Sequence, residues 1–141
     1  MLKKVLGLCA VAAAMTASPL LAQEQARLVA ALGTLETYAD EGLLTRAGEL
    51  EAYFAQAVHG LRGEPNVIDI RNMGLIGAVE LDPIAGEPTK RAFSAFLAAY
   101  DKGILIRTTG DIIAMSPPLI ISKAEIDRLI GTLKEVLDTL E

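Results

Sequence analysis

Gly103-Ile-Leu-Ile-Arg-Thr-Thr-Gly-Asp111 is followed at once by Ile112-Ile-Ala-Met-Ser-Pro-Pro-Leu119. The apolar runs 104–106 and 112–115 flank the turn-forming residues Thr108-Thr-Gly-Asp111, which predicts two antiparallel strands joined by a tight turn. This interpretation places Arg107 at the end of the first strand. A guanidinium held there can donate two parallel hydrogen bonds to a small carboxylate.

The segments around this hairpin alternate between helical and strand-like patterns. Apolar residues recur at steps of three and four over 23–40 and again over 43–61, which predicts two amphipathic helices separated by Gly42. Residues 66–81 are rich in β-branched side chains around Asn72-Met-Gly74 and predict two short strands joined at Gly74. The first helix has its stripe at Leu28, Leu32, Leu35 and Tyr38, and the second at Leu43, Ala47, Leu50, Phe54, Ala57, Val58 and Leu61.

Two more helices complete the pattern. Pro88 can open a helix that places Phe93, Phe96, Leu97 and Tyr100 on one face. Ser122-Lys-Ala-Glu125 is a capping-box pattern that opens a final helix with a continuous apolar stripe. The predicted order α-α-β-β-α-β-β-α indicates an α+β fold, in which helices cover a small, mainly antiparallel sheet.

The composition excludes several classes of protein. A chain of 141 residues with 52% hydrophobic and 22% charged residues is a globular domain, too short for two full lobes. Aromatic residues make up only 4% and the formal net charge is −5, so the chain has neither a stacking platform nor a basic stripe for nucleic acid.

The first 22 residues differ from the rest. A basic start, Met1-Leu-Lys-Lys4, precedes an apolar run over 5–15 and a segment rich in small residues, as in a secretory signal. The run is too short to span a bilayer. We expect cleavage after Ala22, or alternatively near Ala17 or Ser18, and a domain over 23–141. A short buried helix is the other interpretation of residues 1–22.

From about residue 30 to the C-terminus the sequence resembles the C-terminal small domain of class III pyridoxal-phosphate-dependent aminotransferases, in the omega-amino acid:pyruvate (beta-alanine:pyruvate) branch. The resemblance is strongest over 30–141. Four segments carry it: Glu41-Gly-Leu-Leu44, Asn66-Val-Ile-Asp-Ile-Arg-Asn-Met-Gly74, Ile76-Gly-Ala-Val-Glu-Leu81 and the stretch from Gly103 to Ile121.

The resemblance implies a role for Arg107. In this family the matching arginine receives the carboxylate of the substrate, and arginine suits the task because its planar fork stays charged. By spacing alone, Arg107 is a solvated arginine or the partner of a neighbour such as Asp111. Among the other candidates, His59 lacks ligands at metal spacing, Ser94 and Ser116 lack a histidine base, and Gly74-Leu-Ile-Gly77 lacks the third glycine of a dinucleotide site.

The same resemblance implies that pyridoxal phosphate serves the intact family through a Schiff-base lysine, an aspartate and a phosphate cradle in a large domain that precedes this region. Gln23-Glu-Gln-Ala-Arg27 stands where the phosphate-binding segment is expected. Lys90, Lys102, Lys123 and Lys134 do not match the lysine motif of the family. We therefore expect this chain alone to hold no cofactor, to offer no catalytic residue and to be catalytically incompetent.

Three hypotheses about partners follow. In the first, the chain is a small domain whose exposed apolar surface favours self-association. In the second, the same surface binds a large domain that another chain supplies. Alternatively, it is an exported or partner-dependent module that binds small carboxylates through Arg107. The expected location is the periplasm or the exterior if residues 1–22 act as a signal, and the cytoplasm otherwise.

Overall fold

The computed structural model describes residues 23–140 of the chain. The segment 1–22, with its predicted signal and with Cys9, lies outside these described residues, as does Glu141. The chain divides into two compact units between Gly42 and Leu43, where Gly42 adopts a φ of +59°. A left-handed φ of this kind suits glycine and ends the first helical run.

The first unit contains a helix over residues 23–40, as the sequence predicts. Its apolar stripe is exposed: Leu28, Leu32 and Leu35 have exposed fractions of 63%, 59% and 62%. Thr34 and Thr37 donate their hydroxyl protons to the carbonyl oxygens four residues earlier, at 2.9 and 2.8 Å, so these polar groups are satisfied within the helix itself. Within this unit the helix therefore satisfies the hydroxyl groups of both threonines and leaves its apolar stripe exposed.

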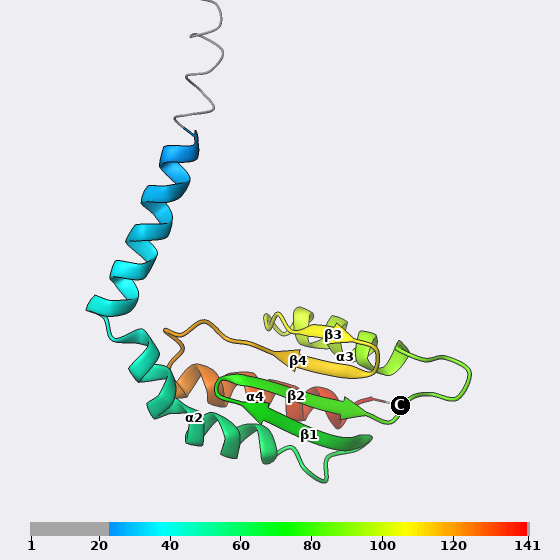
Figure 1. The fold of residues 1–141 in the computed structure, drawn as a ribbon. Helices are drawn as coiled ribbons and strands as arrows, with labels where there is room; N and C mark the ends of the chain where they lie inside the picture. Colours follow the sequence, from blue (N-terminus) through cyan, green and yellow to red (C-terminus); the bar gives the residue numbers. More distant parts are fainter. Residues whose placement is uncertain (1–22, 141) are drawn as a thin grey trace, which may run out of the picture. The chain divides into compact units, whose positions relative to one another are not determined.

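The second unit has helices and strands in the predicted order. They are α2 (Leu43–His59), β1 (Val67–Met73), β2 (Ile76–Leu81), α3 (Lys90–Asp101), β3 (Arg107–Thr109), β4 (Ile112–Met115) and α4 (Lys123–Leu137). The strands form an antiparallel sheet in the order β1-β2-β4-β3 (Figure 1). This arrangement confirms the α+β fold predicted from the sequence.

Two tight hairpins define the register of the sheet. Met73 pairs with Ile76 across Gly74, and Thr109 pairs with Ile112 across Gly110. Both glycines have positive φ angles, 55° and 60°, which two-residue hairpin turns require. The prediction that Gly74 joins two strands is therefore confirmed.

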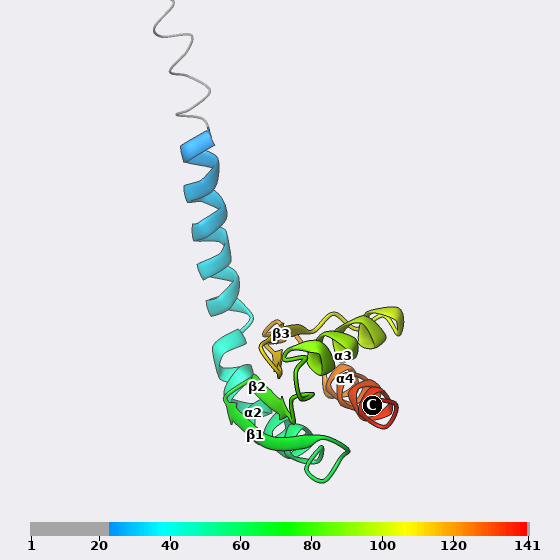
Figure 2. The same cartoon turned by 90° about the vertical axis from the view of Figure 1, so that its right-hand side faces the viewer.

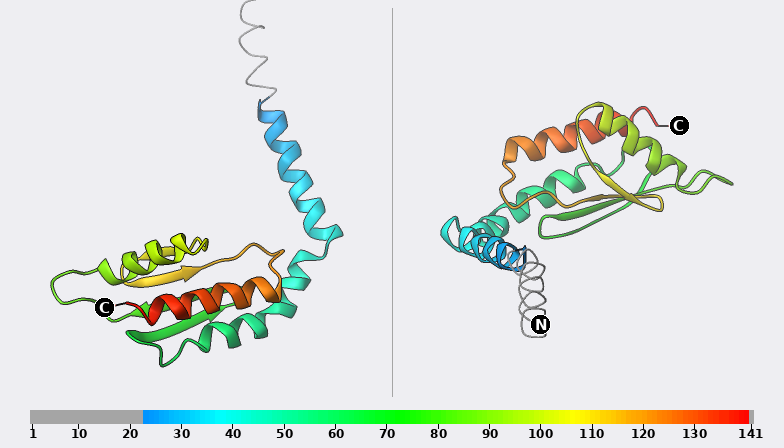
Figure 3. Two further views of the ribbon diagram at one scale, coloured as in Figure 1. Left: turned by 180° about the vertical axis from the view of Figure 1, so that it is seen from behind. Right: turned by 90° about the horizontal axis from the view of Figure 1, so that it is seen from above.

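In this second unit the helices lie together behind the sheet as it is seen in Figure 1, and the left view of Figure 3 shows them from the other side. Figure 2 shows α3 and α4 side by side, on the same side of the sheet. Between the two layers lies the core, in which Phe54, Val79 and Ile113 are fully buried. The opposite face of the sheet is not covered by any helix of residues 43–140.

The predicted stripes of α2 and α4 are the buried ones. Leu50, Phe54 and Val58 of α2 are buried, and α4 buries Ile126, Leu129, Leu133, Val136 and Leu137. A capping box starts α4: Glu125 N–H donates to Ser122 Oγ at 3.2 Å, while Ser122 N–H donates to Glu125 Oε2 at 2.7 Å. This confirms the start predicted for the last helix.

The position of one strand differs from the prediction. Residues 104–106 are not part of the sheet, and the strand instead runs over Arg107–Thr109, so Arg107 begins the strand rather than ending one. The turn is shorter than predicted because Thr108 and Thr109 pair with β4, which leaves only Gly110 and Asp111 in the loop. Apolarity indicates burial or contact, but only the register with β4 decides which residues pair.

Helix α3 also differs from the expectation at its start and on its faces. It begins at Lys90 after Thr89, which has a left-handed φ of 72°, rather than at Pro88. The residues that α3 buries are Ala92, Ala95 and Ala99. Of the predicted apolar stripe, Phe96 is partly buried against the core, whereas Phe93, Leu97 and Tyr100 have exposed fractions of 54%, 47% and 62%. Small alanines let the helix lie close to β3 and α4.

Candidate carboxylate site

Arg107 lies on the face of the sheet that the helices leave uncovered. The registers place Arg71 opposite Ala78, Ala78 opposite Ala114, and Ala114 opposite Arg107. Residues paired in this way across antiparallel strands point to the same face. One row of the sheet therefore carries an arginine at each edge and two small alanines between them.

The two arginines of this row differ in their partners. Arg71 donates from Nη1 to Asp69 and, at 2.8 Å, to Glu80 Oε2, and these carboxylates raise its pKa above the ordinary value. Arg107 is exposed and makes no hydrogen bond or ion pair with any described residue. Of the two, only Arg107 has its full fork available for a ligand.

Asp111 is not the partner of Arg107 that the sequence offered as an alternative. Both of its carboxylate oxygens accept from the backbone N–H of Thr89, each at 3.0 Å. This contact ties the β3–β4 turn to the start of α3, where backbone N–H groups are unpaired and favour an anion. The carboxylate closest in sequence to Arg107 is thus occupied elsewhere.

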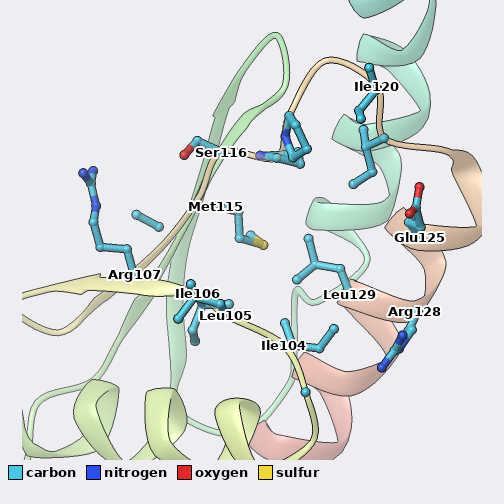
Figure 4. A pocket seen from close by; sticks show the side chains of 15 residues that line it. Ile104, Leu105, Ile106, Arg107, Met115, Ser116, Ile120, Glu125, Arg128 and Leu129 are labelled. Carbon is cyan, nitrogen blue, oxygen red and sulfur yellow. The ribbon is translucent and has the colours of Figure 1, made fainter.

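A cavity of about 700 Å³ lies beside Arg107, where the chain segments that enter β3 and leave β4 diverge. Figure 4 shows Ile106, Met115 and Leu129 in its interior, with Arg107 at one side and Arg128 at the other. The lining comes from 103–107, from 114–118, from Ile120 and Ile121, and from Glu125, Arg128 and Leu129 of α4. Most of these side chains are apolar, so the cavity can hold hydrocarbon next to charged groups.

Arg46 of α2 holds one wall of this cavity in place. Its Nε donates to the carbonyl of Leu119 at 3.3 Å, and its Nη2 donates to the carbonyls of Ile120 and Ile121, at 3.2 and 2.5 Å. Residues 119–121 are not part of the sheet, so the guanidinium supplies donors to carbonyl oxygens that a neighbouring strand would otherwise satisfy. Sequence reasoning did not find this residue, because its partners lie more than 70 positions away.

Arg128 is the other cavity residue that sequence reasoning missed. It lies on α4 three residues after Glu125, and a β-carbon added to Gly103 would come within 3.5 Å of its Nη2 atom. Its side chain forms no hydrogen bond or ion pair with the described residues. On sequence alone it reads as one more charged residue on the polar face of a helix, and no local motif signals the cavity.

The remaining candidates have structural partners. His59 Nε2 lies 2.9 Å from Asn72 Oδ1, and its Nδ1 lies 3.5 Å from Arg62 Nη2. Ser122 caps α4. Over residues 23–140 no group of three or more potential ligands is close enough to hold a metal ion. In the same range no helix has both the length and the apolar character needed to cross a membrane.

The lysines of residues 23–140 do not fit the role of a cofactor-binding lysine. Lys90 pairs with Glu87 at 2.7 Å, Lys102 with Glu135 at 2.8 Å and Lys134 with Glu64 at 2.8 Å. Glu64 also raises the pKa of Lys134, which keeps that amine protonated, whereas a Schiff base requires a neutral amine. Lys123 lies 4.9 Å from the ring centre of Tyr53, and no lysine lines the cavity. None of these four lysines is therefore placed as the residue that would bind pyridoxal phosphate covalently.

Known proteins match the chain both in sequence and in fold. An omega-aminotransferase of Caulobacter vibrioides is 48% identical over 112 residues, which are 79% of this chain and 26% of that protein. A beta-alanine–pyruvate aminotransferase of Pseudomonas aeruginosa is 38% identical over 109 residues, 77% of this chain and 24% of that protein. The chain thus spans about a quarter of the length of these relatives.

Solved structures agree with this assignment. An engineered omega transaminase from Pseudomonas jessenii superposes with a TM-score of 0.69 at 26% identity, covering 74% of this chain and 24% of that one. An adenosylmethionine-8-amino-7-oxononanoate aminotransferase from Methanocaldococcus jannaschii gives a TM-score of 0.68 at 26% identity, covering 78% and 26%. The model of the family described as aminotransferase class III matches residues 16–137, which is most of the sequence, and the chain belongs to the class III aminotransferase family.

Proposed function

We propose that this chain provides the substrate-carboxylate site of a transaminase of the omega-amino acid:pyruvate type. The observation that carries the proposal is the arrangement at Arg107: an exposed guanidinium with no partner among the described residues, on an uncovered sheet face beside an apolar cavity. Relatives named omega-aminotransferase and beta-alanine–pyruvate aminotransferase support this substrate class. Carboxylate binding by Arg107 would fix the orientation of the substrate.

The proposal divides the reaction between this chain and another part of the enzyme. Pyridoxal phosphate, when bound in a transaminase, acts as the electron sink for amino transfer. Residues 23–140 offer no lysine that fits the cofactor, so in this proposal the lysine and the phosphate cradle come from outside these residues. The chain by itself would bind the substrate carboxylate but would not transfer the amino group.

The first test is a calorimetric titration of the full chain with beta-alanine and with pyruvate. We expect saturable binding of both, and Arg107→Gln should weaken it at least about tenfold, since a hydrogen bond to a charged group contributes about 1.5–3 kcal/mol. Arg62→Gln is the matched control, because Arg62 is an exposed arginine outside the cavity. Equal binding by the Arg107 variant and the parent chain would contradict the proposal.

A second test concerns the cofactor. Incubation of the full chain with pyridoxal phosphate, followed by borohydride reduction and peptide mass spectrometry, should give no lysine that is modified in preference to the others. One lysine labelled stoichiometrically and at low cofactor concentration would show that the chain binds the cofactor itself, and the proposed division of the reaction would then be wrong.

A further inference from the structure

The cavity beside β3 is larger than small substrates need. Its volume of about 700 Å³ falls in the range of about 300–1,000 Å³ that suits drug-sized ligands. Pyruvate and beta-alanine each have a three-carbon skeleton and would leave most of this space unfilled. The size of the cavity therefore points to an occupant with a larger body than the substrates considered above.

The interior of the cavity is suited to hydrocarbon. Ile106, Met115 and Leu129 are buried residues that face it, and Leu105 and Ile120 border it with exposed fractions of 77% and 62%. Burying apolar area of this kind is favourable by roughly 25 cal/mol per Å². An aliphatic or aromatic body placed against these residues would cover them and lose its own contact with water.

The charged residues of the cavity lining indicate which headgroup a ligand would carry. Arg107, Arg128 and Glu125 are the ionisable residues of the lining, and Arg128 forms no ion pair with any described residue. Glu125 is engaged in the capping box, where hydrogen bonds from Ser122 hold the pKa of its carboxyl below the ordinary value, so it stays ionised. A carboxylate on the ligand would give Arg128 the partner that the described residues do not provide.

Arg128 is the guanidinium placed to meet that charge. A β-carbon added to Gly103 would lie 3.5 Å from its Nη2 atom, both residues line the cavity, and Figure 4 shows its side chain at the side of the cavity opposite Arg107. Arg107 differs, because its guanidinium in Figure 4 points away from the cavity interior, toward the side of the uncovered sheet face. The two arginines can therefore serve two different carboxylates.

We propose that this cavity is a second binding site, for monocarboxylates with an extended apolar body, in which Arg128 holds the carboxylate and Ile106, Met115 and Leu129 contact the body. This site is separate from the substrate site at Arg107 and does not depend on it. Arg46 acts as a positioning residue for the wall over 119–121, through its hydrogen bonds to three carbonyls.

The test is a calorimetric titration of the full chain with acetate, butyrate, hexanoate and octanoate, below their micellar concentrations. The dissociation constant should fall about threefold to fourfold for each added methylene until the cavity is filled. Octanoate should bind at least tenfold more tightly than 1-octanol, which has the same chain without the charge. Binding that does not saturate, or that is independent of chain length, would overturn the proposal.

Variants separate this site from the one at Arg107. Arg128→Gln should weaken octanoate binding at least tenfold and leave beta-alanine binding unchanged, whereas Arg107→Gln should do the reverse, and Arg62→Gln should alter neither. Unchanged octanoate binding in Arg128→Gln would overturn the second site. Loss of both ligands in Arg107→Gln alone would also overturn it while leaving the proposed function intact. Thermal unfolding of each variant identifies losses that come from misfolding.

Discussion

Whether an arginine of this protein is available to a ligand depends on whether neighbouring carboxylates already form ion pairs with it. Arg71 and Arg107 occupy the same row of the sheet, yet only Arg71 is held by carboxylates, those of Asp69 and Glu80. Asp111 could have neutralised Arg107, but it accepts from the backbone of Thr89. An arginine whose charge is not matched within the fold keeps its hydrogen bonds for a ligand.

At the same scale, the hydrogen bonds between Ser122 and Glu125 make the free energy of unfolding depend on pH. Ser122 donates to the carboxylate of Glu125 and lowers its pKa from 4.5, so the folded state favours the ionised form. A lowered pKa adds stability at neutral pH that is lost as the pH falls below 4.5 through the folded-state pKa. Ser122→Ala should reduce the free energy of unfolding at pH 7 by about 1 kcal/mol.

The measurement is urea denaturation of the parent chain and of Ser122→Ala at pH 7 and pH 3. The difference between the two proteins should be smaller at pH 3, because a smaller fraction of Glu125 is ionised there than at pH 7. A difference that stays constant over this pH range would mean that the Glu125 carboxylate contributes nothing to the cap. Thr132→Ala provides a control on the same helix, remote from the cap.

Gly77 is a second position where one residue decides the packing. A β-carbon there would lie 3.2 Å from Phe54 Cε1, 3.2 Å from Val58 Cγ2 and 3.3 Å from Met115 Cε. Gly77→Ala should therefore lower the free energy of unfolding by about 1–3 kcal/mol, because the core between α2 and β2 is already full. Equal stability of the variant and the parent in urea denaturation would show that these side chains move aside without cost.

At the scale of the elements, α4 offers the opposite prediction. Gly131 lies within this helix and no heavy atom lies within 4 Å of the position that its β-carbon would take. Gly131→Ala should raise the free energy of unfolding by about 0.5–1 kcal/mol, because alanine loses less backbone entropy in a helix. Chemical denaturation of the variant and the parent measures this difference in the free energy of unfolding. A destabilised variant would mean that Gly131 has a contact outside residues 23–140.

Helix α3 shows why the spacing of apolar residues leaves the buried face of an element open. Phe93, Leu97 and Tyr100 share a face as their spacing predicts, but the alanines on the other face make the contact with the core. The rings of Phe93, Phe96 and Tyr100 stack on one another at centroid distances of 5.9 and 6.3 Å. The pattern of hydrophobic residues identifies helices, whereas shape decides which face fits the sheet.

At the scale of the whole molecule, each of the two units exposes an apolar surface. One is the stripe of the helix over 23–40 and the other is the aromatic face of α3. We expect the full chain to self-associate, with an average mass that rises with concentration in analytical ultracentrifugation. Replacing Leu28, Leu32 and Leu35 by glutamine should lower the association, since it removes the apolar stripe from that helix.

The control for this prediction is the replacement of Glu24, Glu36 and Glu49 by glutamine, exposed positions that add no apolar area. A parent chain that stays monomeric at all accessible concentrations would contradict the prediction. So would a leucine variant that associates as strongly as the parent, because the stripe would then play no part.

The sequence alone determined the order of helices and strands, the capping box of α4, the hairpin at Gly74 and the family, because each depends on local spacing or on a long contiguous motif. Only the tertiary structure decided that Arg107 begins β3, that Asp111 turns to Thr89 and that Arg46 supports the cavity wall. The reason is physical: hydrogen-bond register and side-chain packing join residues far apart in the chain, and no local pattern of polarity encodes them.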